Sequence, residues 1–215
     1  GEYAGHLLEA VRAGKPLLPE QVTSAVTPVV QSVLRSADAL FWLNALRERG
    51  DYEYTHALHC TILAAAFGRH LGLPEPMLIR VAGGALLLDI GKTQLPVELL
   101  TYPGPLDPRQ TTMVQRHVEM SLEILRSSGQ TSPEILDMVR AHHERVDGSG
   151  YPRGLQGAEI PLLGRMAAIV DTFDAMTSDR PYRKGISRHD ALQQLYALRD
   201  RLFQAELVER FIQCM

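Results

Sequence analysis

Apolar residues recur at steps of three and four along almost the whole chain, and this spacing limits the possible folds more than any other feature. Residues 20–49 carry Val26, Val30 and Val33 at this spacing, and residues 54–71 are apolar almost without interruption. Such steps place side chains on one face of an α-helix. Strand-like runs joined by hairpin turns are absent from the sequence. We therefore predict an all-α helical bundle.

Several residues mark where the predicted helices begin and end. Proline at a first helical position, a preceding Asp or Ser, and glycine after the last turn are the usual signals. The predicted elements are a helix over 20–49 kinked or interrupted at Pro28, helices over 54–71 and 76–90, one helix starting at Asp107-Pro108, one starting at Ser132-Pro133 and running toward His142, a loop over 145–161, and helices over 162–177, from Ser187, and over 204–215.

The composition excludes some classes of protein and partner. The chain has 215 residues, 45% of them hydrophobic, so a large core can form, and its net charge of −3 gives no basic field for long nucleic acid. No apolar run has the length of a membrane-spanning helix, and no secretion signal is visible. Cys60 and Cys214 form no CxxC pair, and Cys60 is interpreted as a small core residue. We expect a cytoplasmic protein.

Six residues with metal-ligand chemistry lie inside otherwise apolar helical segments. They are His56, Asp89, His117, His142, His143 and Asp171. A single helical histidine or aspartate is more often structural or solvent-facing. Together, imidazole nitrogens and carboxylate oxygens suit divalent first-row metals, and Asp89 has two oxygens with which to bridge two ions. His142 and His143 need a helix end, or different roles, to share one site, because adjacent helical side chains diverge by about 100°.

Cations near these residues favour a phosphate ligand. Lys92 follows Asp89 by about one turn, and Arg180, Arg183 and Lys184 follow the helix of Asp171. Arginine binds phosphate through paired hydrogen bonds. Taken alone, Lys92 is also typical of a helix end facing water, and the arginines of a solvated loop.

The segment "HHERVDGSGYPRGLQGAEIPLLGRMAAIVDTFDAMTSDRPYR" (142–183) closely resembles the signature of HD-GYP domains, and "YTHALHCTILAAAFGRHLGL" and "GALLLDIGKTQLP" fit earlier segments of that family. The resemblance covers about residues 50–185. It implies an all-α HD-superfamily fold and hydrolysis of the bacterial messenger cyclic di-GMP. It also implies a cofactor of one or two divalent ions such as iron or manganese.

Matching positions then receive the roles of the family. The resemblance implies metal ligation by His56, Asp89, His117, His142, His143 and Asp171, with Asp89 as the bridging ligand. It implies catalysis by Asp89 and Lys92, and substrate contacts from Lys92, Asp174, Arg180 and Arg183. Gly150, Tyr151 and Pro152 are the GYP letters, in a loop that the family links to diguanylate cyclase (GGDEF) partners.

Leu88 is the main departure of this sequence from the family pattern. The family has a histidine here, so by its pattern one ion retains only His56, Asp89 and Asp171, whereas the other keeps every protein ligand. Loss of a donor predicts a weakened site. His59 matches no family ligand, and Tyr52 replaces the glutamate of three-metal members, so no third ion is expected.

Two classes of function stay open at this point. One is a slow or metal-limited cyclic di-GMP phosphodiesterase that forms pGpG or GMP; the other is a degenerate cyclic di-GMP sensor or a GYP-mediated scaffold. A different nucleotide substrate is less favoured. We expect residues 1–50 to be a helical lead-in, the end of a larger upstream region, and residues 51–215 to be the HD-GYP domain.

Overall fold

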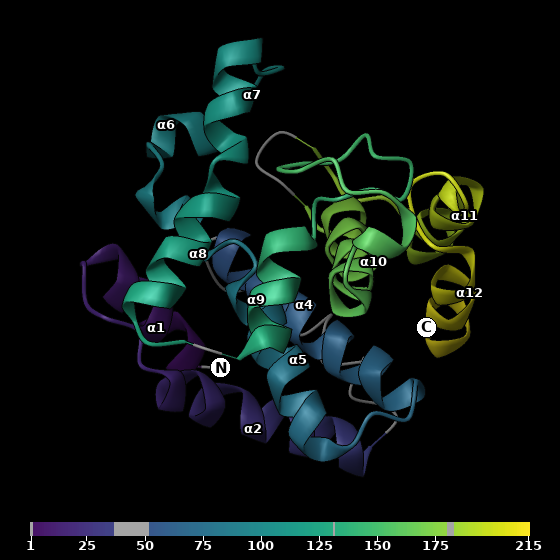
Figure 1. Ribbon diagram of the computed structural model, residues 1–215, viewed down its shortest axis with the longest axis horizontal. Helices are drawn as coiled ribbons and strands as arrows, with labels where there is room; N and C mark the ends of the chain where they lie inside the picture. Colours follow the sequence, from purple (N-terminus) through teal and green to yellow (C-terminus); the bar gives the residue numbers. More distant parts are fainter. Residues whose placement is uncertain (1, 37–51, 131, 180–182) are drawn as a thin grey trace.

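The computed structural model describes residues 2–36, 52–130, 132–179 and 183–215 (Figure 1). These ranges form α-helices and short 3-10 turns, and their only β contacts are two isolated bridges. The all-α prediction is confirmed. The helices are α1 (Glu2–Arg12), α2 (Pro19–Arg35), α4 (Tyr52–His70), α5 (Glu75–Leu87), α6 (Val97–Leu100), α7 (Pro108–Gln115), α8 (His117–Ser127), α9 (Pro133–Ala141), α10 (Leu162–Thr177), α11 (Arg188–Leu198) and α12 (Ala205–Cys214), with 3-10 turns η2 (Ile90–Gln94) and η3 (Gly157–Glu159).

The caps at Asp107 and Ser187 agree with the sequence. The Asp107 carboxylate accepts the backbone N–H groups of Arg109 and Gln110, which leaves two fewer unpaired donors at the start of α7. The Ser187 hydroxyl accepts the N–H of Asp190 at the start of α11. These side chains fix where the two helices begin.

One predicted helix is divided in the structure, and another is continuous at Pro28, where the sequence allowed either a kink or an interruption. The single helix expected after Asp107 is divided at Arg116 into α7 and α8. No interruption is present at Pro28, because α2 runs through it. Pro28 removes the hydrogen bond to the carbonyl of Ser24, but both residues are exposed, so the lost bond does not lie in the core. The part of the predicted 20–49 helix beyond residue 36 lies outside the described residues.

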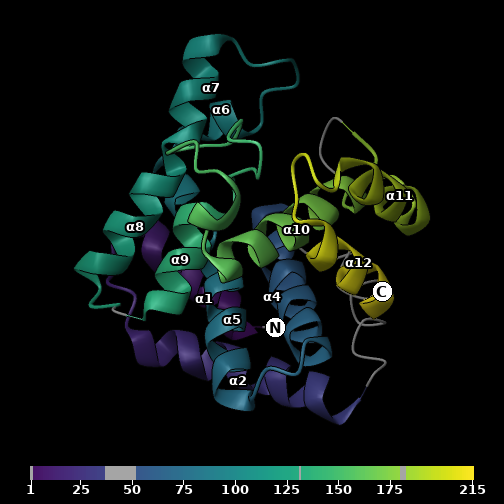
Figure 2. The ribbon, with the colours of Figure 1, turned by 45° about the vertical axis from the view of Figure 1, so that its right-hand side comes forward.

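Helix α4 is the centre of the bundle. Residues from His56 to Gly68 are almost all buried, and a helix that is apolar on every side must be covered on every side. Figures 1 and 2 show α4 enclosed by α2, α5, α10 and α12. Its two sides contribute to two separate apolar clusters.

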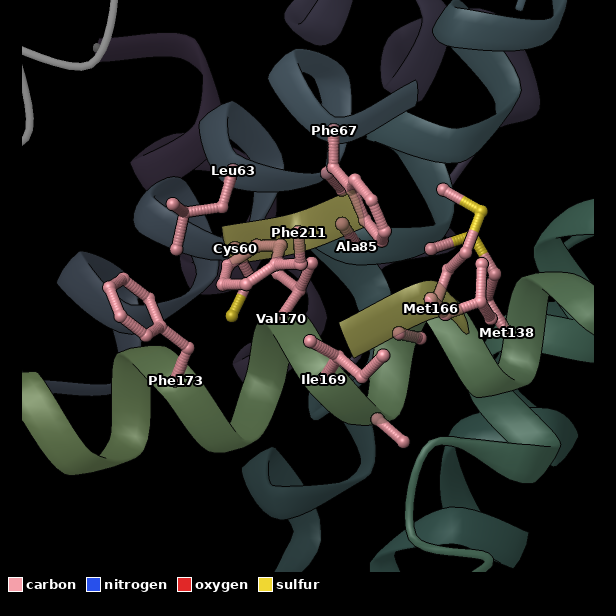
Figure 3. Packing of buried hydrophobic residues seen from close by; sticks show 14 of the residues in the cluster. Cys60, Leu63, Phe67, Ala85, Met138, Met166, Ile169, Val170, Phe173 and Phe211 are labelled. Atoms are coloured by element: carbon pink, nitrogen blue, oxygen red, sulfur yellow. The ribbon is translucent and has the colours of Figure 1, made fainter. Parts of the chain in front are cut away.

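The first cluster joins α4 and α5 to α9–α12 (Figure 3). Phe67 of α4 and Phe173 of α10 each meet the ring of Phe211 of α12 edge-on, with centroids 5.2 and 5.1 Å apart. Leu88 and Cys60 belong to this cluster and are 2% and 1% exposed. Cys60 therefore packs as a core residue, as the sequence predicts.

The second cluster joins the N-terminal helices to the same central pair. Val22, Val26 and Val30 of α2 are buried with Leu78 of α5. Residues 2–36 thus share a core with α4 and α5. The domain boundary predicted near residue 50 falls outside the described residues and stays a prediction.

Helices α6 and α7 project from one end of the bundle in both views (Figures 1 and 2). They frame one side of the region where the ends of α5, α8 and α9 meet. Across the described ranges, each helix is too short or too polar to be a candidate for crossing a membrane.

Candidate metal centre

Five chain segments bring the six predicted ligand residues together. His56 lies in the first turns of α4, and Asp171 lies in the middle of α10. The remaining four lie at helix ends: Asp89 just after α5, His117 at the first position of α8, and His142 and His143 just after α9. The break at Arg116 and the end of α9 at Ala141 allow their rings to converge, and the His142 and His143 centroids are 4.0 Å apart.

Gly91 allows this convergence beside Asp89. A Cβ at Gly91 would collide with the His117 carbonyl oxygen and the Ser121 backbone nitrogen. Its N–H instead donates to Ser121 Oγ at 2.8 Å, and Ser121 Oγ donates to the Leu88 carbonyl at 3.3 Å. These contacts hold the Asp89 turn against the start of α8.

Asp89, His117, His142 and His143 form what we call the histidine half-site. Each offers a donor atom within 4.8 Å of the others. Nδ1 of His117 lies 2.7 Å from the Val114 carbonyl, and Nδ1 of His142 lies 2.9 Å from the Val139 carbonyl. A carbonyl only accepts, so each Nδ1 carries a proton and donates it to that bond, which leaves Nε2 of each ring facing the centre.

His56, Asp171 and the Oδ2 oxygen of Asp89 form what we call the carboxylate half-site. His56 Nε2 lies 3.0 Å from Asp171 Oδ1 and 3.5 Å from Asp89 Oδ2. On the opposite edge of the ring, His56 Nδ1 lies 2.7 Å from Asp174 Oδ2. The Asp174 carboxylate accepts a hydrogen bond from Nδ1, and this bond directs Nε2 toward the half-site.

Asp174 is placed behind His56 and not against the cavity. Its Oδ1 accepts from His59 Nδ1 at 2.8 Å and from Ser178 Oγ at 3.0 Å, and the residue is 2% exposed. Asp174 was expected to contact the substrate. The structure corrects this expectation, because both of its carboxylate oxygens accept hydrogen bonds from the protein itself. His59, left without a ligand role by the sequence, supports Asp174.

Lys92 contacts the Asp89 carboxylate directly. Its Nζ lies 2.7 Å from Asp89 Oδ2 and 3.4 Å from Glu53 Oε2. Burial alone would lower the pKa of Lys92, but these two carboxylates raise it above its usual value. The ammonium therefore stays charged at neutral pH.

The electrostatics of the centre keep Asp89 and His143 in the forms that bind metal, whereas at His56 burial is outweighed by the surrounding carboxylates, which raise its pKa. Burial would raise the pKa of Asp89, but Lys92 and His117 hold it well below its usual value. Burial and the neighbouring His142 lower the pKa of His143. Asp89 is therefore ionised and His143 neutral at pH 7.

The GYP loop forms a wall of the same centre. The Tyr151 ring stacks on His143 with centroids 4.6 Å apart, and Tyr151 N donates to the His143 carbonyl at 3.1 Å. A Cβ at Gly150 would collide with the backbone of residues 143–145, so glycine permits this approach. Glu144 accepts the N–H groups of Arg153 and Leu155 and fixes the rest of the loop.

A cavity of about 330 Å³ opens onto both half-sites. Arg145 and Tyr151 line the cavity, although the sequence did not assign them to it. The position of Arg145 close after His142 and His143 was the sequence feature that could have indicated its place. Arg183 lines it as predicted, and Arg180 lies outside the described residues. The lining residues are His56, Asp89, Lys92, Val114, His117, His143, Arg145, Tyr151, Asp171, Thr172, Ala175, Met176 and Arg183.

Buried atoms of the histidine half-site fit a metal ion. Asp89 Oδ1 lies 3.0 Å from His117 Nε2 and 3.7 Å from His142 Nε2. Within the described part of the chain, none of these three buried atoms has a hydrogen-bond partner. A divalent cation would satisfy both lone pairs and the carboxylate at once.

Comparisons with known proteins agree with this geometry. Residues 34–207 match the family model described as "HD domain". The chain is 40% identical over 185 residues to cyclic di-GMP phosphodiesterase PA4108 of Pseudomonas aeruginosa, covering 86% of this chain and 44% of that protein. It is 35% identical over 172 residues to a cyclic di-GMP phosphodiesterase of Thermotoga maritima, covering 79% and 47%.

Another relative and a solved structure extend the comparison. The 3'3'-cGAMP-specific phosphodiesterase 2 of Vibrio cholerae is 36% identical over 168 residues, covering 78% of this chain and 31% of that protein. The HDG"Y"P protein Bd1817 of Bdellovibrio bacteriovorus superposes with a TM-score of 0.79 at 16% identity, covering 98% of this chain and 67% of that one.

The chain spans less than half the length of these three curated relatives. The family match covers most of the described helices, and Bd1817 shares the arrangement of nearly the whole chain. The chain belongs to the HD domain family and has the all-α fold of an HD-GYP protein.

Proposed function

We propose that this domain is a metal-dependent phosphodiesterase that acts on cyclic di-GMP and forms pGpG or GMP. The observation that carries the proposal is the set of buried nitrogen and oxygen atoms around Asp89 Oδ1 that have no hydrogen-bond partner and that one cation would satisfy. The names of the relatives support the substrate class, since they hydrolyse cyclic di-GMP or cGAMP.

Residues of the two half-sites would hold the ions. Asp89, His117, His142 and His143 would bind one ion, and His56, Asp171 and Asp89 Oδ2 the other. When bound, such ions polarise a phosphoryl oxygen and lower the pKa of water. A phosphodiesterase with two neighbouring ions uses both effects.

Positively charged side chains of the domain would bind the phosphodiester. Lys92 is charged and contacts Asp89, so it would neutralise charge that develops on the phosphate or the leaving oxygen. Arg145 and Arg183 line the same cavity, and their guanidinium groups would bind further phosphate oxygens. Tyr151, whose ring stacks on His143, would contact the same ligand.

Leu88 favours a second candidate, a cyclic di-GMP sensor or GYP-loop scaffold with little hydrolysis. Leucine supplies no donor to the carboxylate half-site, where the family has histidine. Tyr151 packs against His143, which supports a role in the site in addition to the proposed contact with diguanylate cyclases.

Product analysis separates the two candidates. Purified protein is incubated with Mn²⁺ or Fe²⁺ and either cyclic di-GMP or 3'3'-cGAMP, and the nucleotides are resolved by chromatography. We expect slow conversion of cyclic di-GMP. Calorimetric binding without product would establish the sensor, and neither binding nor product would leave only the scaffold.

A further inference from the structure

Cys60 lies one helical turn after His56, with its sulfur beside the carboxylate half-site. His56, Cys60 and Asp171 each offer a donor atom within 4.8 Å of the other two, and all three are buried. Figure 3 shows the sulfur facing α10, the helix that carries Asp171. The thiol is therefore not enclosed by apolar groups alone.

Cys60 Sγ lies close to the His56 ring and midway between its two nitrogens, so the sulfur must shift toward Nε2 for both residues to bind one ion. Cys60 Sγ lies 3.8 Å from both ring nitrogens of His56. Nδ1 is engaged by Asp174 behind the ring, and Nε2, which lies 3.0 Å from Asp171 Oδ1, is the atom that faces the half-site. A tetrahedral ion with usual metal–nitrogen and metal–sulfur bonds separates these donors by about 3.5 Å.

The donor count also suits this role. His56, Asp171 and Asp89 supply three protein ligands, one fewer than expected, because Leu88 supplies none. Leu88 is buried and belongs to the same apolar cluster as Cys60. A thiolate from Cys60 would restore the count from a different helix.

We propose that Cys60 is a metal ligand of the carboxylate half-site and compensates for Leu88. On binding, the thiol releases its proton to solvent and the sulfur bonds to the ion. Thiolate ligands favour Zn²⁺, Co²⁺ and Fe²⁺ over Mn²⁺ and Mg²⁺, so this half-site prefers the first group. The inference deepens the proposed function, because it concerns the second ion of the same site.

Cobalt spectroscopy tests this ligation without measuring hydrolysis. The chain has two cysteines, so Cys214→Ser leaves Cys60 as the sole thiol. We expect wild type and Cys214→Ser to develop a near-ultraviolet thiolate-to-cobalt absorption as the second equivalent of Co²⁺ binds. Cys60→Ser should lack it and retain one ion per chain by elemental analysis.

A double variant separates ligation from packing. Leu88→His in the Cys60→Ser background should restore the second ion but not the absorption band. The proposal is overturned if Cys214→Ser saturated with Co²⁺ shows no thiolate band, or if Cys60→Ser keeps it. If Cys60→Ser does not fold, the band of Cys214→Ser alone decides.

Hydrolysis is assayed separately on the same proteins. A thiolate band without turnover would support Cys60 as a ligand and contradict the enzyme proposal. Turnover without the thiolate band would support the enzyme proposal and contradict Cys60 as a ligand.

Discussion

The two half-sites share Asp89 but satisfy their polar atoms in opposite ways. In the histidine half-site, backbone carbonyls accept hydrogen bonds from Nδ1 of His117 and His142, and the Nε2 atoms of these rings face Asp89 Oδ1. In the carboxylate half-site, Lys92 contacts Asp89 Oδ2, and His56 lies between Asp171 and Asp174.

This difference predicts the order in which ions bind. The histidine half-site has buried atoms that only a cation or extra protons can satisfy, which favours metal strongly. In the carboxylate half-site an ion must compete with His56 and Lys92 for carboxylates that are already paired. We therefore expect the first ion to bind in the histidine half-site and the second to bind more weakly.

Asp89→Asn should have the largest effect, because both half-sites use this carboxylate. The amide keeps the size of the side chain but removes the negative charge that the two proposed ions would share. We expect at least about 100-fold weaker metal binding and lower hydrolysis, beyond the usual cost of changing a group that only supports a ligand. Elemental analysis after dialysis and product chromatography measure both.

Asp137→Asn is the matched control, since Asp137 pairs with Arg140 on α9 away from the cavity. It should retain wild-type metal content. Full metal occupancy in Asp89→Asn would contradict the bridging role.

His117→Ala and His56→Ala should separate the half-sites. His117→Ala removes a lone pair from the first ion, so we expect affinity for that ion to fall about 10–100-fold or more. His56→Ala should leave the first ion bound and weaken only the second. Calorimetric titration with Mn²⁺ or Zn²⁺ gives both steps, and equal losses in the two variants would refute the predicted order.

Asp174→Asn should change the acid stability of the metal-free protein. Burial alone would raise the pKa of Asp174, but hydrogen bonds from His56 and His59 lower it to about 2. The ionised form therefore stabilises the fold above the unfolded-state pKa near 4, by about 2 kcal/mol, and this is lost as pH falls toward 2.

Urea unfolding of wild type and Asp174→Asn between pH 2 and 6 measures this term. Wild type should lose more stability than Asp174→Asn across that range. Parallel pH profiles would show that Asp174 contributes no ionised hydrogen bonds to the folded state.

Leu88→His should have the smallest effect on metal binding in the wild-type background. If Cys60 already completes the carboxylate half-site, a new histidine should raise affinity for the second ion by less than about tenfold. The variant also places a polar ring in an apolar cluster, so its free energy of unfolding should fall. A sharp rise in second-ion affinity and hydrolysis would show instead that the half-site lacks a donor.

The sequence predicted the helices well because apolar spacing and capping residues act locally. Asp107 and Ser187 begin α7 and α11 as expected. The break at Arg116 was missed, since the apolar spacing continues across it. That break matters, because it makes His117 the first residue of α8.

Residue type and family resemblance identified the candidate metal ligands. They did not identify the residues that form hydrogen bonds with these ligands. Asp174 was expected to contact a ligand, yet its neighbours His56 and His59 lie more than 110 positions away. Arg145 lines the cavity beside the paired histidines, which residue type alone did not indicate.

The sequence by itself determined an all-α core and the chemical types available to a metal centre, because helical periodicity and donor atoms belong to individual segments. Only the tertiary structure decided which nitrogen of each histidine faces inward and which oxygen of Asp89 meets which partner. Those choices depend on carbonyls, carboxylates and an ammonium brought together by packing, and no local pattern of residues encodes these distances.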